Sequence, residues 1–284
     1  MILLLFLNFL FTGGDSLTST LEKKASVKDF MDAVSVTVDG KENIYVLDAA
    51  ANQIVKYSNN LEYKKRNGKQ GWAEGQYDSP TYIDGSSGLD ILVSDGKNFR
   101  LQRLDLELNP ISMLYTDLAD FSEELRFRTP VASLVMNSNQ LFVIDKDNQR
   151  IVVYNDGRIA SGVFGDFKSG KGKLGEPVKL LKDSKNFVYV LDKELKAVMR
   201  FDNLGNFVKK IEITGLENFS IRDNILYLFD GSEITKYDLD LNSVVDKISL
   251  PKSKSKTKYK DFLVFSDEKY LLLKKNELSL WVKK

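Results

Sequence analysis

The sequence predicts an all-β protein, and three observations support this prediction. A short apolar run that ends in a charged residue occurs six times along the chain. The ends of successive runs lie 38 to 50 residues apart, and a second strand-like segment follows each run. Glycine-rich loops and prolines separate several of these units. Because this repeat length is typical of one four-stranded propeller blade, we expect a six-bladed β-propeller with four-stranded blades.

The recurrent run has the composition of a buried strand. The first copy, residues 44–48, reads Ile-Tyr-Val-Leu-Asp, and the sixth copy ends in Lys274 instead of an aspartate. The five aspartates that end a run are Asp48, Asp95, Asp145, Asp192 and Asp230. An aspartate at the same place in every unit more often bonds backbone N–H groups of the following turn than it binds a ligand. We therefore interpret these five as structural residues of the repeat.

Further strands flank each run. A second strand begins six residues after the aspartate in the first four units, and alternation such as residues 54–57 fits a half-buried strand. A proline stands fifteen residues before the aspartate in three units, at Pro80, Pro130 and Pro177. Proline is tolerated at the first residue of a strand, so each marks the start of another strand. The fourth strand is clearest at residues 207–211.

The two ends of the chain predict how the ring closes. The sequence stops directly after the third strand of the last unit, so that unit lacks one strand. One spare strand stands ahead of the first unit, around residues 25–30. We expect this N-terminal strand to complete the last blade and close the ring.

Residues 1–16 have the pattern of a signal peptide. Residues 2–11 are apolar apart from Asn8, and small and polar residues follow. The run is shorter than the roughly 20 apolar residues that span a bilayer. We therefore expect export to the periplasm or the medium, with residues 17–284 forming a single propeller domain that does not insert stably into a membrane. A buried first strand is the alternative interpretation of this run.

Two loops that lead into predicted blades, which we call entry loops, add a more specific pattern. Residues 68–80 and 164–177 each combine several glycines with an aromatic residue or leucine ahead of a proline. Together with the apolar run that ends in Asp and the continuation at residues 145–151, this pattern resembles the NHL repeat. The resemblance covers the chain from about residue 27 to residue 284 and is weaker in the last two units. It implies a six-bladed plan that is shared by lactonases, amidating lyases and many non-enzymatic exported propellers.

The composition excludes several kinds of chemistry. The chain has no Cys and no His, so disulfides, thiol nucleophiles and imidazole general bases are excluded. Its 41 basic and 40 acidic residues create no overall field that would attract nucleic acid. We expect no cofactor and no nucleic-acid partner. The resemblance implies a His-bound metal for the lyase type, which this chain cannot supply. For the lactonase type it implies a Ca²⁺ held by Glu, Asn and Asp in the central channel.

Aromatic and arginine side chains in the entry loops are the candidate binding residues, because these types dominate interface hot spots. They are Trp72, Tyr77, Arg126, Arg128, Phe164 and Phe167. We expect them on one loop-rich face of the ring, with some of them packing between blades. The sequence contains no nucleophile elbow and no Walker loop, and we assign no catalytic residue and no metal ligand.

These observations favour an exported, non-enzymatic binding or scaffold propeller. Its loop-rich face would contact a protein, a peptide or a glycan at the cell envelope. A Ca²⁺-dependent hydrolase or lactonase of the same fold is the alternative.

Overall fold

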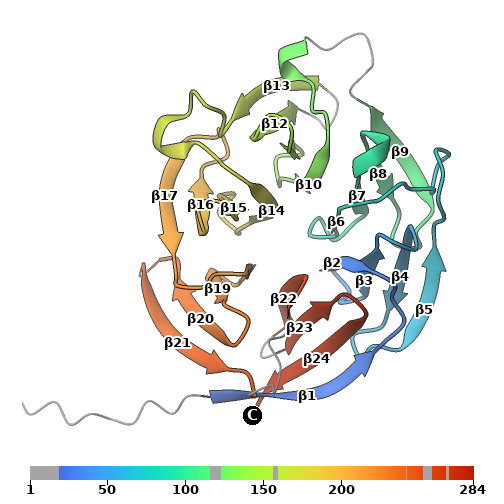
Figure 1. The fold of residues 1–284 in the computed structure, drawn as a ribbon, viewed down its shortest axis with the longest axis vertical. Coiled ribbons are helices and arrows are strands. Elements are labelled where there is room, and N and C mark those ends of the chain that lie inside the picture. Colours follow the sequence, from blue (N-terminus) through green and yellow to red (C-terminus); the bar gives the residue numbers. More distant parts are fainter. Residues whose placement is uncertain (1–18, 116–122, 156–158, 241, 252–257, 267–268) are drawn as a thin grey trace, which may run out of the picture.

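The computed structural model describes residues 19–115, 123–155, 159–240, 242–251, 258–266 and 269–284. Its sheets stand side by side around a central axis (Figure 1). Helix in the described residues is confined to three-residue 3-10 turns, and none is long and apolar enough to cross a membrane. The predicted all-β propeller is confirmed, whereas the predicted signal peptide at residues 1–16 lies outside the described residues.

Four sheets have four antiparallel strands each, in sequence order. The first sheet contains β2 (Ala33–Val38), β3 (Ile44–Asp48), β4 (Gln53–Tyr57) and β5 (Tyr63–Asn67). The second contains β6 (Tyr82–Asp84), β7 (Ile91–Asp95), β8 (Arg100–Leu104) and β9 (Pro110–Tyr115). The third contains β10 (Pro130–Val135), β11 (Leu141–Asp145), β12 (Arg150–Asn155) and β13 (Ile159–Phe164). The fourth contains β14 (Pro177–Lys182), β15 (Val188–Asp192), β16 (Ala197–Phe201) and β17 (Phe207–Glu212).

The remaining strands form one eight-stranded sheet in the order β18-β19-β20-β21-β1-β24-β23-β22. Its first half contains β18 (Asn218–Arg222), β19 (Ile225–Phe229), β20 (Glu233–Asp238) and β21 (Ser243–Ser249). Its second half contains β22 (Asp261–Ser266), β23 (Lys269–Lys274), β24 (Glu277–Lys283) and β1 (Ser19–Val27). The halves meet where Ser19 and Thr20 pair in parallel with Ile248 and Ser249. The structure therefore differs from the expected six separate sheets at this junction.

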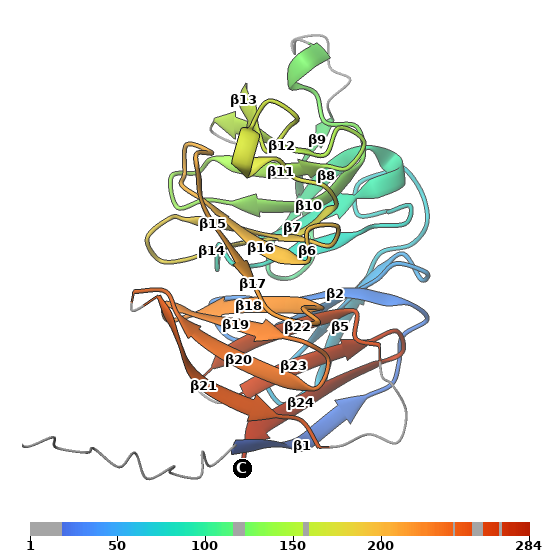
Figure 2. The same ribbon diagram turned by 60° about the vertical axis from the view of Figure 1, so that its left-hand side comes forward.

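The N-terminal strand pairs with the C-terminal strand. β1 runs antiparallel to β24, from Leu21 opposite Lys283 to Val27 opposite Leu278 (Figure 2). Lys23 also forms an ion pair of 2.8 Å with Glu277. The predicted partner of the last unit is thus present, although it spans residues 19–27 instead of residues 25–30.

The core lies between neighbouring four-stranded units. Each second strand is buried on both faces, as in β3, β7, β11 and β15. Alternate residues of such a strand therefore pack against different neighbours. Ile44 and Val46 pack with Leu271 of β23, whereas Tyr45 and Leu47 pack with residues of the second sheet. This two-sided burial explains why the runs are apolar throughout and do not alternate.

One end of the ring carries the segments that enter the innermost strands and the turns between the second and third strands. We call this end the entry face. Contacts between units show that these segments are neighbours around the ring. The Ser79 backbone N–H donates to Asn52 Oδ1 of the preceding unit (2.8 Å), and the Ala33 N–H donates to the Lys275 carbonyl (2.8 Å). The entry segments of the first and second sheets therefore lie beside the turns of the preceding units at this end.

Candidate binding face

The repeat aspartates hold the entry segments in place. Asp192 accepts hydrogen bonds from the backbone N–H groups of Gly175 (2.7 Å), Glu176 (3.1 Å) and Leu195 (2.9 Å). Bonds from the entry segment are also made to Asp48, Asp95 and Asp145. Asp230 instead accepts bonds from the backbone N–H groups of Ser232 and Glu233 in its own turn. These contacts suit structural residues, and in the first four sheets they tie the entry segment to the end of the second strand.

One buried arginine holds the glycine-rich loop that precedes β6. Arg100 is fully buried, and its Nε donates to Asp95 Oδ2 at 2.9 Å. Its Nη2 donates to the carbonyl oxygens of Gln76 (2.8 Å) and Ala73 (3.2 Å), and its Nη1 donates to that of Trp72. A guanidinium offers five donors in a rigid plane, so it can fix several carbonyls at once. The loop is therefore held in one conformation by the second sheet.

Two exposed aromatic side chains lie on this frame. Trp72 is 63% exposed and Phe99 is 49% exposed. Phe99 lies between Asn98 and Arg100, and Asn98 Nδ2 donates to the carbonyl oxygen of Gly71 at 2.9 Å. Asn98 and Arg100, on either side of Phe99, thus bind the backbone of Gly71 and Trp72. We call Trp72 and Phe99 the aromatic pair.

Phe99 has an unfavourable backbone conformation. Its φ of 52° and ψ of 40° place it in the left-handed region, which is uncommon for a bulky residue. The equivalent turns of the first, third and fourth sheets also have a positive φ, but there the residues are Asn52, Gln149 and Lys196. In this turn the second sheet therefore carries an exposed aromatic residue where the other three sheets carry polar ones.

The other candidate residues are dispersed. Tyr77 is 1% exposed and Phe164 is 6% exposed, and both pack in the core, which removes them from any contact surface. Phe167 is 76% exposed, but it lies on the entry loop of the fourth sheet, two units from Trp72. Arg128 is exposed, whereas Arg126 is half-buried and its carbonyl oxygen accepts a bond from Arg150 (2.9 Å). The structure therefore groups Trp72 with Phe99 and not with the other candidates.

A buried ionic network fills the centre of the ring at the entry face. The Lys179 ammonium donates to Asp261 Oδ1 (2.6 Å), Asn218 Oδ1 (2.9 Å) and the Phe262 carbonyl oxygen (2.9 Å). Only 5% of the Lys179 side chain and 4% of the Asp261 side chain are exposed. Asp261 Oδ2 also accepts bonds from Ser35 Oγ (3.2 Å) and the backbone N–H of Val36 (2.9 Å). The network joins β14, β18, β22 and β2 across the axis.

A pocket of about 250 Å³ lies over this network. Its rim includes Lys193, Glu217, Tyr259 and Lys260. Tyr82 lies deeper, and its hydroxyl donates to the Leu180 carbonyl oxygen at 3.1 Å. Burial raises the pKa of Tyr82, so this phenol stays protonated and keeps its donor.

The residues of the Lys179 network under this pocket do not fit a Ca²⁺ ion. Calcium takes six to eight oxygen ligands, whereas one carboxylate, one amide and one carbonyl oxygen here bind the Lys179 ammonium instead. Within the described ranges, no three Asp, Glu, His or Cys side chains come together as a metal site would require. Lys179 supplies the positive charge of this cage itself.

A second buried charge lies toward the opposite end of the axis. Asp84, at the end of β6, is 4% exposed and accepts hydrogen bonds from the backbone N–H and the hydroxyl of Ser86, both at 3.1 Å. Burial raises the pKa of this carboxyl group. Burial also lowers the pKa of Lys182, whose ammonium donates to the Val135 carbonyl oxygen at 2.6 Å. Both residues lie at the ends of innermost strands.

Sequence reasoning missed Phe99, Arg100, Lys179 and Asp261. Arg100 and Arg150 stand five residues after a repeat aspartate, and both bond to it, at 2.9 and 3.2 Å. That spacing is readable in the sequence. Lys179 lies between apolar residues of a predicted strand, where alternation suggests a solvent-facing side chain. Lys179 is buried because β14 is the innermost strand of its sheet, and the sequence alone does not show that position.

Comparisons with known proteins support the fold. The chain matches no protein-family profile. A segment of 151 residues, 52% of the chain, is 27% identical to Protein brain tumor of Drosophila melanogaster, but this match covers only 14% of the Drosophila protein. The fold is similar to that of a streptogramin B lyase, with a TM-score of 0.63 and 10% identity over 94% of this chain and 99% of that one.

Two further solved structures show the same likeness. Virginiamycin B lyase from Staphylococcus aureus has a TM-score of 0.63 and 10% identity, covering 93% of this chain and 99% of the lyase. A protein assigned as a gluconolactonase has a TM-score of 0.66 and 10% identity, covering 94% of this chain and 92% of its own. At this identity the likeness shows the propeller fold and does not extend to activity.

Proposed function

We propose that this protein is a non-enzymatic binding propeller whose entry face contacts a protein partner through the aromatic pair, Trp72 and Phe99. In this proposal the repeats are NHL-like and the ring has six blades. The eight-stranded sheet then counts as two blades that are joined through β21 and β1.

The observation that carries the proposal is the way Arg100 holds the loop. Its contacts to the carbonyl oxygens of Trp72, Ala73 and Gln76 fix the backbone under a tryptophan that remains 63% exposed. A preformed loop loses little conformational entropy on binding, so more of the contact energy appears as affinity. Tryptophan is also the residue type most enriched at interface hot spots. A rigid, exposed tryptophan beside a strained, exposed phenylalanine is the arrangement expected of an interface anchor.

Site-specific photo-crosslinking tests this proposal. A benzoylphenylalanine at position 72 should give a discrete adduct with one protein in the native host. The matched control is the same probe at position 204, because Leu204 is 77% exposed but lies in the turn between β16 and β17 of the fourth sheet, two units from Trp72. Equal labelling of the same protein from both positions, or no discrete adduct from position 72, would refute the proposal.

The purified partner then allows a quantitative test. Trp72→Ala should weaken binding by about 2 kcal/mol or more, which is roughly 30-fold in Kd. Leu204→Ala should leave Kd unchanged. A Trp72→Ala variant that binds as tightly as the wild type would place the interface elsewhere.

We also propose that the protein acts outside the cytoplasm, at the cell envelope. The support is the apolar run of residues 2–11, which has the length of a signal-peptide core. Fractionation with mass spectrometry of the N-terminus checks this proposal. We expect a processed chain in the extracytoplasmic fraction, and an unprocessed chain in the cytoplasm would contradict export.

The Ca²⁺-dependent hydrolase of the same fold remains the alternative function. It requires a tightly held Ca²⁺ ion and an activity that is lost on chelation. Because the Lys179 ammonium occupies the position among Asp261, Asn218 and Phe262 that a cation would take, we expect calorimetric titration of the wild-type protein with Ca²⁺ to show no saturable binding there. Stoichiometric binding together with turnover of a lactone would favour the enzyme.

A further inference from the structure

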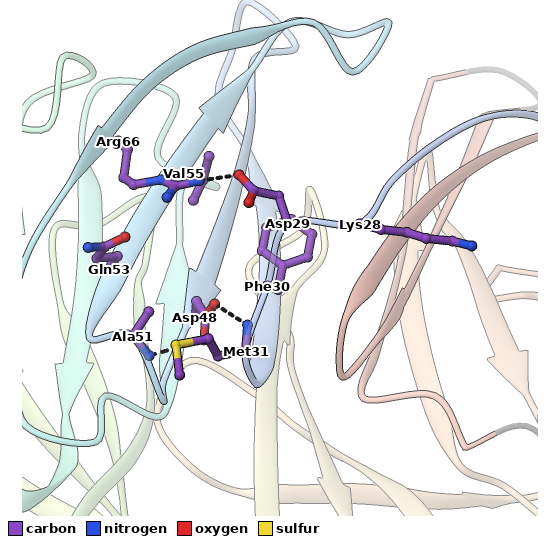
Figure 3. Close-up of a pocket in the computed structure, with 9 residues that line it drawn as sticks. All are labelled: Lys28, Asp29, Phe30, Met31, Asp48, Ala51, Gln53, Val55 and Arg66. Atoms are coloured by element: carbon purple, nitrogen blue, oxygen red, sulfur yellow. Dashed lines mark hydrogen bonds and ion pairs between the residues drawn. The ribbon is translucent and has the colours of Figure 1, made fainter.

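A second concave site lies on the first sheet, away from the aromatic pair. It is a pocket of about 390 Å³ between the link from β1 to β2 and strands β4 and β5 (Figure 3). Its lining includes Ala51, Gln53, Val55 and Arg66 from the sheet. Phe30 and Met31 line it from the link, where Met31 is 65% exposed. The volume lies within the range of roughly 300–1,000 Å³ that is typical of ligand sites.

The second sheet shows what normally fills this place. In the strand register Gln53 lies opposite the repeat aspartate Asp48, as Arg100 lies opposite Asp95. Ala51 stands three residues after its aspartate, which is also the position of Asn98 relative to Asp95. The pocket on the first sheet is therefore equivalent to the site above Asn98 and Arg100.

In the second sheet, that site is occupied by the chain itself. Asn98 and Arg100 donate to carbonyl oxygens of the loop at residues 71–76. Gln102, two residues further along β8, adds bonds to the Gln76 carbonyl oxygen (2.5 Å) and from the Gly75 N–H (2.9 Å). Side chains of β7–β8 thus receive the main chain of a tight loop.

The first sheet has the same frame without the loop. Only residues 28–32 connect β1 to β2, whereas residues 68–81 connect β5 to β6. The equivalents of Asn98, Arg100 and Gln102 are the shorter Ala51, Gln53 and Val55. Among the described residues, the side-chain amide of Gln53 has no hydrogen-bond partner. The space that the loop fills in the second sheet is the pocket of the first.

We propose that this pocket receives a tight loop of a partner polypeptide, with main-chain carbonyl oxygens bound by Gln53 and Arg66. Arg66 pairs with Asp29 through one nitrogen, which leaves other guanidinium donors for a ligand. The carboxylates of Asp29 and Asp48 also line the pocket and disfavour a free anion. The apolar surfaces of Val55, Phe30 and Met31 suit the uncharged parts of a peptide. This proposal does not depend on the aromatic pair.

The probe for this proposal is a synthetic peptide of residues 68–78, because this loop occupies the equivalent site. Titration is followed by the NMR signals of the Gln53 side-chain amide and the backbone amides of Ala51 and Arg66, which report affinities into the millimolar range. We expect saturable shifts with this peptide and none with a scrambled peptide. Equal shifts with the scrambled peptide, or the same shifts with acetate alone, would overturn the proposal.

Three variants sharpen the test. Gln53→Trp fills the pocket from a partly exposed position and should abolish the shifts at Ala51 and Arg66. Ala51→Asn with Gln53→Arg restores two donors of the second sheet and should tighten binding by about tenfold or more. Lys64→Ala is the control, because its ammonium bonds to Asn43 and it does not line the pocket. Failure of both the wild type and the donor-restored variant to bind the peptide would refute the proposal.

Discussion

Breaking the buried pair of Lys179 and Asp261 should be one of the most destabilising single changes to the ring. In Lys179→Met, Asp261 keeps its bonds from Ser35, Val36 and the Phe262 N–H, but its charge loses the only buried cation that the structure shows against it. Removing one partner of a buried pair costs about 3–5 kcal/mol. Because a domain of this kind is stable by only about 5–15 kcal/mol, the loss should be easily measured.

Urea unfolding at pH 7, followed by tryptophan fluorescence, measures this effect. Lys179→Met should lower the free energy of unfolding by about 3–5 kcal/mol. Lys185→Met is the matched control, because Lys185 pairs with Asp240 at the surface, where the side chains are 53% and 59% exposed. An exposed pair of this kind contributes about 1 kcal/mol or less.

A double-mutant cycle separates the pair from the rest of the site. Lys179→Met combined with Asp261→Asn removes both charges, so the double variant should lose less than the sum of the single losses by about 1–3 kcal/mol. Additive losses, or a loss below about 1 kcal/mol for Lys179→Met, would refute the view that the ammonium neutralises a buried charge.

Three further predictions follow from other residues. Arg100→Lys cannot bind Asp95 and three carbonyls at once, so it should lose about 3 kcal/mol in urea unfolding and expose the loop at residues 71–76 to limited proteolysis, whereas an uncleaved loop would contradict its role. Phe99→Asn should raise the free energy of unfolding by about 1 kcal/mol, because asparagine tolerates the left-handed conformation, and should weaken partner binding; a loss of stability would argue against strain. Burial raises the pKa of Asp84 above its ordinary value of 3.8, so the carboxyl group loses its proton at a lower pH in the unfolded chain than in the folded one. The free energy of unfolding therefore decreases as the pH rises from about 3.8 through the raised pKa. The free energy of unfolding of Asp84→Asn should therefore increase relative to that of the wild type between pH 3 and pH 7. A difference that does not depend on pH would refute the raised pKa.

The repeat made most of the architecture predictable. The apolar runs end at the same residues as strands β3, β7, β11 and β15, because a strand buried on both faces needs apolar side chains throughout. The join between β21 and β1 was not predictable, since two residue pairs at the outer edge leave no periodic signal. The N-terminal strand was placed too late, at residues 25–30. The backbone N–H groups of Met31 and Asp32 bind Asp48 instead of continuing the ladder.

The candidate face was less predictable than the fold. Aromatic content located the loop of Trp72, but it could not separate Trp72 from Tyr77. The loop folds back on itself through a bond from the Tyr77 N–H to the Lys69 carbonyl oxygen (2.9 Å), and this turns Tyr77 into the core. Phe99 occupies a turn position whose equivalents in the first, third and fourth sheets are polar residues, and its exposure is not visible in the sequence. Its φ belongs to the repeated turn, whereas tertiary contacts decide its exposure.

The pairing of β1 with β24 has a consequence for the order of folding. Sheets such as β2–β5 form from consecutive hairpins, so their strands can pair as soon as their own residues have been made. The contact between Lys23 and Glu277 instead joins residues 254 positions apart, which requires the closure of a very long loop. During synthesis β1 must wait, with an unpaired edge, until the final strand emerges. We therefore expect ring closure to be the slow, last step of folding and this seam to be the first part of the native protein to open.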